Sequence, residues 1–150
     1  LNKIFNRNDM LVFMSQMKSH KGEFTPPPAL LPVVAKVKNC YLIWVALHQT
    51  LPKVQKHSLG QKIDNLFVET IEAVSVAWFL SPSEKQPYIR LAIRKWDTLK
   101  VLLLVLWETK GIDNKKYIAL SAPIEEVGKM LGGWNGQVSK QNSPAVAREK

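Results

Sequence analysis

Basic side chains are concentrated in two stretches of this sequence, where their spacing suits phosphate binding better than catalysis. No carboxylate lies between Glu23 and Asp64, although that span contains five lysines. Residues 85–100 contain three lysines and two arginines, with Asp97 as their only carboxylate. Basic side chains without neighbouring carboxylates are available to a nucleic-acid backbone. We expect contacts to nucleic acid or a protein partner from Lys36, Lys38, Lys53, Lys56, Lys62, Arg90, Arg94, Lys95 and Lys100.

The same charges have a less specific interpretation, in which they only keep the protein soluble. The net charge of +9 favours a polyanion or an acidic protein surface as partner, without deciding between them. Arg90 and Arg94 share a helix face because they lie four residues apart, but Arg94 can also pair with Asp97. The basic stretches therefore predict a binding surface and leave its ligand open.

Residues suited to catalysis or metal binding are few and poorly spaced. His20, His48 and His57 form no pair with metal-ligand spacing, and no nucleophile–base pair can be assembled with them. The single cysteine, Cys40, falls on an apolar stripe, so we expect it to be buried and unreactive. One cysteine excludes an internal disulfide and fits a reducing cytoplasm. The sequence therefore predicts a cytoplasmic protein that is not an enzyme and has no cofactor or metal.

Hydrophobic periodicity predicts the elements that position these residues. Apolar residues recur at steps of three and four in four segments joined by short connections. This pattern predicts an all-α fold, an antiparallel up-and-down four-helix bundle over residues 30–135. The first helix is expected to begin near Pro32 and to end before Pro52, and the second to follow Ser58 as its N-cap.

Prolines and glycines set the predicted bounds of the last two helices. The third helix is expected to begin within residues 84–88 and to end at Gly111. In the fourth, Pro123 predicts a kink or a start near Ser121, because proline lacks an amide donor. Gly132-Gly133 predicts the end of this helix, after which the chain turns back.

The segment from Tyr41 to Leu47 is apolar on every side of its helix. Such a helix must be covered on more than one face, and in so small a bundle the second cover is another copy of the chain. We therefore expect a homo-oligomer, with Tyr41 and Trp107, which lie off the main stripes, at contacts between copies. The tryptophans expected in the core, and hence unavailable for base stacking, are Trp44, Trp78, Trp96 and Trp134.

The two ends of the sequence lack helical periodicity. Residues 1–29 include three consecutive prolines and predict a flexible leader. Because position 1 is not methionine, residues before Met14 or Met17 can also be read as an upstream extension that is not native. Residues 136–150 predict a disordered basic tail. The longest apolar run, Val101 to Trp107, is far shorter than the roughly 20 residues that span a bilayer, so no membrane partner is expected.

Two sequence phrases carry a resemblance to a known family. They are Leu51-Pro52-Lys53 with Leu59-Gly60-Gln61-Lys62-Ile63, and Met130-Leu131-Gly132-Gly133-Trp134. They resemble the four-helix-bundle family of the accessory variability determinant (Avd) proteins of diversity-generating retroelements. Relatives in this family are encoded by intervening sequences in bacterial 23S ribosomal RNA genes. The resemblance covers residues 30–135, departs from the family's unbroken last helix at Pro123, and implies structural roles for Pro52, Gly60, Gly132, Gly133 and Trp134.

The resemblance also implies a function. Members of the family form pentameric barrels with a basic surface, and Avd binds its reverse transcriptase and nucleic acid during mutagenic copying of a template RNA. The implied function is a non-catalytic accessory protein that binds a reverse transcriptase and RNA, or an RNA–DNA hybrid, as a homopentamer. The alternative is a stand-alone oligomeric bundle that binds another protein or ribosomal RNA and has no reverse-transcriptase role.

Overall fold

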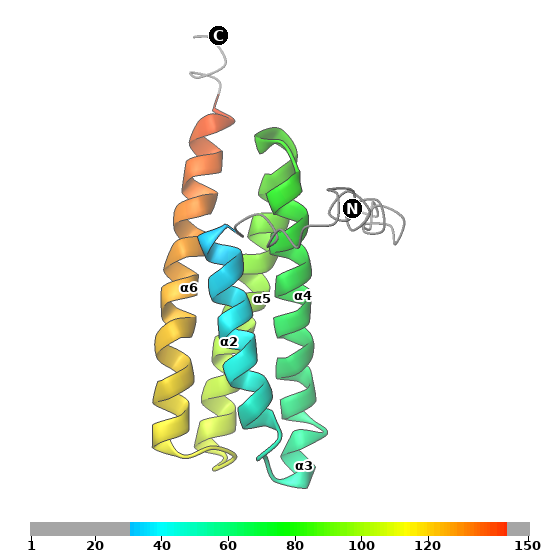
Figure 1. Ribbon diagram of the computed structural model, residues 1–150, viewed down its shortest axis with the longest axis vertical. Coiled ribbons are helices and arrows are strands. Elements are labelled where there is room, and N and C mark those ends of the chain that lie inside the picture. Colours follow the sequence, from blue (N-terminus) through cyan, green and yellow to red (C-terminus); the bar gives the residue numbers. More distant parts are fainter. Residues whose placement is uncertain (1–30, 144–150) are drawn as a thin grey trace, which may run out of the picture. The chain divides into compact units, whose positions relative to one another are not determined.

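Residues 31–143 are described by a computed structural model, and in this part of the chain they form a four-helix bundle (Figure 1). No strand occurs among the described residues, which confirms the all-α prediction. The predictions for residues 1–30 and 144–150 lie outside the described residues. The helices are α2 (Pro32–His48), α3 (Lys53–Lys56), α4 (Leu59–Phe79), α5 (Pro82–Glu108) and α6 (Asn114–Gln141).

The four long helices pack so that α2 and α5 occupy opposite corners. α2 packs against α4 and α6, and α5 packs against the same two helices. The connection between α4 and α5 and the connection between α5 and α6 lie at opposite ends of the bundle (Figure 1). Because α2 has 17 residues and α6 has 28, α6 extends beyond α2 at the end where α4 passes to α5 (Figure 1).

An aromatic layer of Trp44, Phe67 and Trp96 crosses the bundle. Trp44 of α2 stacks on Phe67 of α4, with ring centroids 6.0 Å apart. Phe67 meets Trp96 of α5 edge to face at a centroid distance of 5.5 Å. The indole Nε1 of Trp96 donates to the carbonyl oxygen of Ile124 in α6 over 2.9 Å. All three rings are fully buried, so one chain of contacts joins the four long helices.

In the first half of the bundle the structure agrees with the predicted helix starts and differs in the connection between α2 and α4. α2 begins at Pro32 as predicted, and its predicted stripe is buried. Between α2 and α4 the sequence predicted only a loop, whereas the structure has the one-turn helix α3. Ser58 precedes α4 as predicted, but its hydroxyl does not cap that helix and donates instead to the carbonyl oxygen of Val54 over 2.7 Å. The predicted N-cap interaction is therefore wrong, because the Ser58 hydroxyl is bonded to a backbone carbonyl oxygen of α3.

Two prolines, Pro87 and Pro123, lie inside helices. α5 begins at Pro82, earlier than predicted, and so contains Pro87. α6 starts well before Pro123 and contains it, so the predicted start near Ser121 is wrong, while the alternative of a kink at Pro123 stays a prediction. A proline deprives the carbonyl four residues earlier of its amide donor. Those residues are Ser83 and Ala119, and both are exposed, so water can bind their carbonyl oxygens.

α6 also continues past Gly132 and Gly133, so the predicted helix end at these glycines is wrong. Residues 136–141, predicted as part of a disordered tail, are helical. Both glycines are exposed, with nothing within 4 Å of the position of a Cβ. Downstream packing explains the extension, because Val138 is buried in a cluster with residues of α4 and α5. This burial offsets the helix penalty of about 0.5–1 kcal/mol for each glycine relative to alanine.

The turn after α5 places a lysine where glycine is usual. Lys110 has a φ of 64°, in the left-handed region. Its amide donates to the Trp107 carbonyl over 3.0 Å, and the Gly111 amide donates to the Leu106 carbonyl over 2.9 Å. This capping pattern favours glycine at the left-handed position, where another residue costs about 1 kcal/mol. Gly111 is needed for space, since a Cβ there would lie 2.5 Å from Leu106 Cδ1 and 2.8 Å from Gln55 Oε1.

We expect alanine to have opposite effects on stability at Gly60 and at Gly132, because only Gly60 is crowded. A Cβ at Gly60 would lie 3.0 Å from the backbone oxygen of Gln55 and 2.9 Å from Leu51 Cδ1. Because that oxygen cannot move without displacing α3, we expect Gly60→Ala to lower the free energy of unfolding by about 1–3 kcal/mol. Gly132→Ala fills open space and should raise it by about 0.5–1 kcal/mol. Chemical denaturation measures both changes.

The two variants control for one another, because each exchanges glycine for alanine within a helix. Equal effects of the two substitutions would contradict the close approach at Gly60. A destabilising Gly132→Ala would contradict the continuous α6, since alanine is penalised where a glycine ends a helix in the left-handed conformation.

Candidate nucleic-acid interface

Lys36 and Lys95 are held in ion pairs with carboxylates from other helices. Lys36 Nζ lies 3.0 Å from Glu126 Oε1, and Lys95 Nζ lies 2.8 Å from Glu69 Oε2. These partners are distant in the sequence, so the expectation of uncompensated charge is wrong for both lysines. Their proposed contacts to a ligand remain a prediction, but their charge is already partly compensated.

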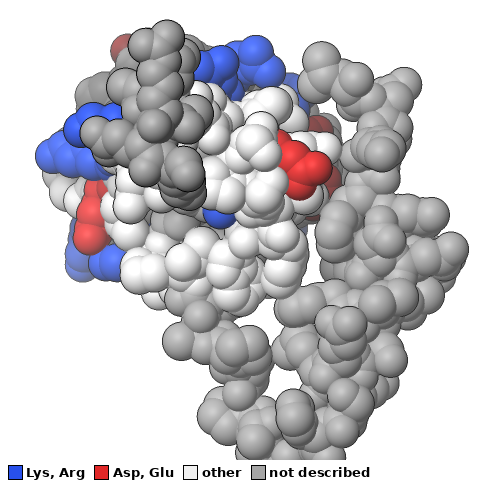
Figure 2. All heavy atoms as spheres, turned by 90° about the horizontal axis from the view of Figure 1, so that it is seen from above, with Lys and Arg blue, Asp and Glu red and all other residues white. Residues whose placement is uncertain are grey.

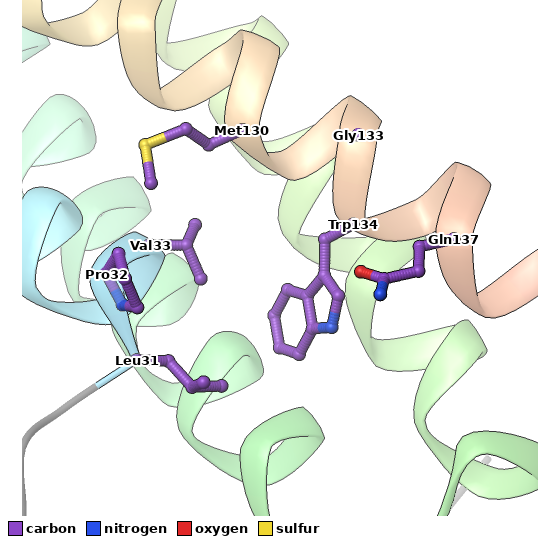
Figure 3. Close-up of a pocket in the computed structure, with 7 residues that line it drawn as sticks. All are labelled: Leu31, Pro32, Val33, Met130, Gly133, Trp134 and Gln137. Atoms are coloured by element: carbon purple, nitrogen blue, oxygen red, sulfur yellow. The ribbon is translucent and has the colours of Figure 1, made fainter.

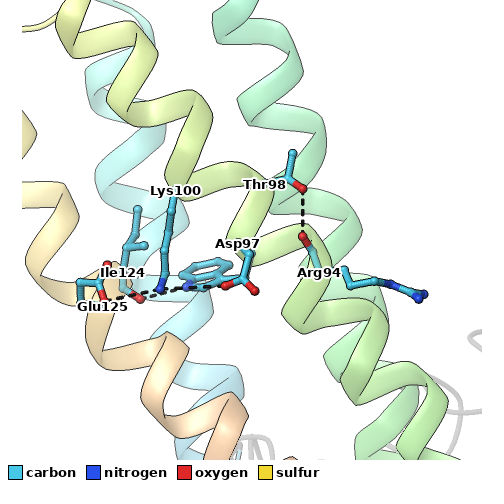
Figure 4. A network of polar contacts seen from close by, with 7 residues as sticks. Arg94, Asp97, Thr98, Lys100, Ile124 and Glu125 are labelled. Atoms are coloured by element: carbon cyan, nitrogen blue, oxygen red, sulfur yellow. Dashed lines mark hydrogen bonds and ion pairs between the residues drawn. The ribbon is translucent and has the colours of Figure 1, made fainter.

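Lys100 is likewise paired, in the network that Figure 4 shows. Its Nζ lies 3.4 Å from Glu125 Oε2 and 4.0 Å from Asp97 Oδ1. The side chain passes close to Gly128, where a Cβ would lie 3.0 Å from Nζ. Arg94 does not pair with Asp97, and its side chain points away from the network (Figure 4). Partly exposed pairs of this kind contribute about 0–1 kcal/mol each.

The other six predicted residues form no ion pair with another described residue. They are Lys38, Lys53, Lys56, Lys62, Arg90 and Arg94. The two arginines lie on the exposed face of α5, about 21 Å (Arg94) and about 27 Å (Arg90) along the helix axis from its last residue. Lys38 is the only one of the six on α2. Lys53 and Lys56 lie in α3, and Lys62 lies in the first turn of α4. The structure therefore divides the predicted set and does not gather it into one cluster.

The turn between α5 and α6 brings further lysines to α3. Gln55 Nε2 of α3 donates to the Thr109 hydroxyl over 2.9 Å and to the Thr109 carbonyl oxygen over 3.3 Å. α3 and this turn share one end of the bundle (Figure 1). We call this surface, formed by residues 50–62 and 107–117, the lysine-rich end. Its lysines are Lys53, Lys56, Lys62, Lys110, Lys115 and Lys116.

Hydrogen bonds hold the backbone of the lysine-rich end in place. His48 Nε2 bonds the carbonyl oxygen of Lys56 over 3.1 Å, which requires the tautomer protonated at Nε2. The Asp113 carboxylate caps α6 by accepting from the backbone amide of Lys116 over 2.8 Å. Lys116 Nζ lies 3.4 Å from the hydroxyl of Thr50, so the α6 side also contacts the end of α2. The ammonium groups are thus presented from a fixed backbone.

Positive charge is in surplus at the lysine-rich end. Six lysines share the surface with two carboxylates, Glu108 and Asp113, and Asp113 is engaged in the cap of α6. The ion pairs of the described residues all lie elsewhere in the bundle. Figure 2 views the opposite end, where uncharged residues fill most of the middle of the visible face and Lys and Arg gather towards its margin. The lysine-rich end is therefore the candidate site for a polyanion.

The lysines of the α5–α6 turn were not among the predicted contacts. In the sequence, Glu108 and Asp113 lie close to Lys110, Lys115 and Lys116, so this segment alone shows little net positive charge. A signal was nevertheless present in the predicted topology. In an up-and-down bundle the first and third connections lie at the same end, which brings the two groups of lysines together.

The tryptophan rings are buried or half-buried in the bundle. Trp44 and Trp96 are fully buried, which confirms their predicted place in the core, whereas Trp78 and Trp134 are half-buried. Trp107 is also half-buried and stacks on a tyrosine of α6 at a centroid distance of 5.1 Å. Rings packed in this way are poorly placed to stack on nucleic-acid bases.

An apolar hollow of about 320 Å³ lies between the start of α2 and the C-terminal part of α6 (Figure 3). Its lining residues are Leu31, Pro32, Val33, Met130, Gly133, Trp134 and Gln137. None of these seven has a titratable side chain, so they provide no acid, base or nucleophile. Within residues 31–143, no three His, Cys, Asp or Glu side chains are grouped so that they could hold a metal ion. No described helix has the length and apolarity that crossing a bilayer requires.

Cys40 is buried, as predicted, and desolvation raises the pKa of its thiol to about 11, with Glu126 acting in the same direction. At pH 8 only about one thiol in a thousand is then ionised, and the thiolate is the reactive form. We expect Ellman's reagent to label the folded protein slowly at pH 8 and the urea-unfolded protein rapidly. Equal labelling rates in the two states would contradict the burial of Cys40.

Comparisons of this chain with protein-family models, curated proteins and solved structures found no match. The resemblance to the Avd family therefore remains a prediction that rests on two sequence phrases. The lysine-rich end is defined by the geometry and charge of the chain itself.

Proposed function

We propose that this protein is a non-catalytic, nucleic-acid-binding accessory protein of a diversity-generating retroelement. In this proposal it binds the reverse transcriptase and the template RNA in the cytoplasm and supports mutagenic reverse transcription, while the polymerase performs the chemistry. The uncompensated charge of the lysine-rich end is the observation that carries RNA binding. The retroelement role is supported by the resemblance of residues 51–63 and 130–134.

The lysine-rich end suits a phosphate backbone in its charge and in its rigidity. Lysine ammonium groups displace counterions from nucleic acid, and this release drives binding at low salt. The contacts of Gln55 and His48 fix the backbone that carries the lysines, so little conformational entropy is lost on binding. Since the tryptophan rings are buried or half-buried, we expect contacts to phosphates and not base stacking.

Two triple variants test RNA binding and its location. Changing Lys53, Lys56 and Lys115 to glutamine should weaken binding at least tenfold and lower the slope of log affinity against log salt by about 2, since each phosphate contact contributes about 0.7–0.9. Changing Arg90, Arg94 and Lys95 to glutamine should weaken binding by a smaller factor, because Lys95 is already paired with Glu69. Fluorescence anisotropy at several salt concentrations measures both effects.

The two sets carry the same charge change, and circular dichroism checks that helicity is retained. A larger effect of the α5 set would place the main contacts on α5. Unchanged affinity of both variants would overturn RNA binding through either surface.

We further propose that the helices run antiparallel, up and down, and that copies of the bundle assemble as a homopentamer. The turns at opposite ends of α5 support the first statement (Figure 1). Two exposed apolar surfaces support self-association: Leu42 and Ile43 on α2 are 58% and 40% exposed, and Val101 and Leu104 on α5 are 59% and 38% exposed. Because α2 and α5 occupy opposite corners, each copy can contact one neighbour through α2 and another through α5. Head-to-tail contacts of this kind close into a ring when the rotation between neighbouring copies is a whole fraction of a turn, as the proposed pentamer requires.

Leu42→Glu and Val101→Glu form a matched pair that tests this arrangement. Each variant should leave one apolar face intact and fail to form the ring, because a glutamate carboxylate would be desolvated in the contact. When the two variants are mixed, the intact faces should meet and give a one-to-one dimer by light scattering. Val68→Glu, on the exposed face of α4, is the control and should leave the oligomer unchanged.

A monomeric wild-type protein at micromolar concentration would contradict self-association. Two variants that stay monomeric when mixed, beside an oligomeric wild type, would show that the α2 and α5 faces do not meet one another.

The alternative function is a stand-alone oligomeric bundle that binds another protein or ribosomal RNA through the same surface. A pull-down from the native host, with identification of bound protein and RNA, separates the two. Recovery of a reverse transcriptase with one dominant structured RNA supports the accessory function. Recovery of ribosomal RNA or of an unrelated protein alone supports the alternative.

A further inference from the structure

Lys110 has a backbone conformation that its own side chain does not favour. It is the one non-glycine residue with a positive φ in residues 31–143, at 64°. Its amide and that of Gly111 complete the capping pattern at the end of α5. Glycine is the usual residue at this left-handed position, because a Cβ there crowds the backbone.

Gly111, next to Lys110, cannot be replaced by a larger residue without a clash. A Cβ at Gly111 would lie 2.5 Å from Leu106 Cδ1 and 2.8 Å from Gln55 Oε1. Exchanging the order of lysine and glycine would therefore break the contact between the α5–α6 turn and α3. Gly111 thus occupies the position that has no room for a Cβ. Lys110 occupies the left-handed position, where glycine would remove the backbone strain.

The side chain of Lys110 makes no polar or ring contact within the described part of the fold. The residue is exposed, and its ammonium group has no hydrogen bond, ion pair or ring contact with another described residue. A backbone conformation that disfavours lysine, at a residue whose ammonium group makes no polar contact within the fold, points to a role outside the folded chain.

We propose that Lys110 is a dedicated RNA phosphate contact of the lysine-rich end, retained there at a cost to the stability of the fold. This inference rests on the proposed RNA binding. The contact of Gln55 with Thr109 fixes the turn against α3, so Lys110 joins Lys53 and Lys56 on one surface. An RNA backbone that crosses the junction of α3 and the turn contacts lysines from both segments.

The composition of this surface favours phosphate over an acidic protein partner. Interfaces between proteins are depleted in lysine and enriched in aromatic residues, methionine and arginine around an apolar centre. The charged groups of the lysine-rich end include six lysines and no arginine. Its one large exposed apolar side chain is Val54, at 82%. A lysine ammonium binds phosphate as a compact point charge and needs no apolar surround.

Three substitutions in the 150-residue chain separate the effect of backbone strain from the effect of charge. Lys110→Gly should raise the melting temperature by roughly 2–5 °C, because glycine relaxes the left-handed backbone. The same variant should weaken binding to a fluorescent RNA hairpin severalfold and lower the salt slope by about 0.7–0.9. Lys110→Gln should weaken RNA binding equally while leaving the melting temperature near that of the wild type. Lys140→Gln, an exposed lysine in the last turn of α6, is the control for loss of one charge elsewhere.

The outcomes distinguish this inference from the function on which it rests. Wild-type protein that fails to bind the hairpin at low salt overturns the proposed RNA binding, and with it the role of Lys110. Binding that is weakened by Lys53→Gln but unaffected by either Lys110 variant overturns the role of Lys110 alone. A melting temperature that falls in Lys110→Gly overturns the strain argument. Equally tight binding of polyglutamate, with the same loss in Lys110→Gln, assigns the surface to an acidic protein instead of phosphate.

Discussion

The aromatic layer of Trp44, Phe67 and Trp96 is the constraint on which the rest of the bundle depends. Its rings come from three helices, and both buried indoles need a hydrogen-bond acceptor. Trp44 Nε1 finds the Asp64 carboxylate at 3.2 Å, and Trp96 Nε1 finds the Ile124 carbonyl oxygen at 2.9 Å. Each acceptor lies on the helix next to its donor. A hydrogen bond with two fixed ends sets both the height and the rotation of a helix, which apolar packing alone does not do.

This rotation decides which side chains face outward. With Trp96 directed into the core, residues on the opposite face of α5 are exposed, and these change from arginines near its middle to valines and leucine near its end. In the same way, Trp44 in the core leaves Leu42 and Ile43 outside. The apolar faces at opposite corners are therefore consequences of the buried layer. A sequence that placed its large rings elsewhere would expose a different set of residues.

The sequence predicts the parts of this structure that depend on neighbours within one helix. The buried stripes, the start of α2 at Pro32 and the buried Cys40 all follow from spacing. Prediction from the sequence fails where contacts with a distant segment determine the structure, because tertiary packing outweighs local helix propensity. Val138, buried with residues of α4 and α5, extends α6 beyond its glycines. For the candidate interface the same limit appears, since the carboxylates that pair Lys36, Lys95 and Lys100 come largely from other helices. The lysines of the α5–α6 turn join α3 only in three dimensions.

Under the proposed function, the bundle separates the residues that stabilise it from the residues that bind its partner. Six lysines with few carboxylates repel one another, and Lys110 adds an unfavourable backbone conformation. Such features are tolerated where burial is slight, because solvent and salt screen the repulsion. The fully buried layer supplies the stability that the exposed end lacks. A polyanion at this end would bind through the attraction of its phosphates and would also relieve the repulsion among the lysines. In the proposed complex, the charge that weakens the free protein is the charge that favours the bound state.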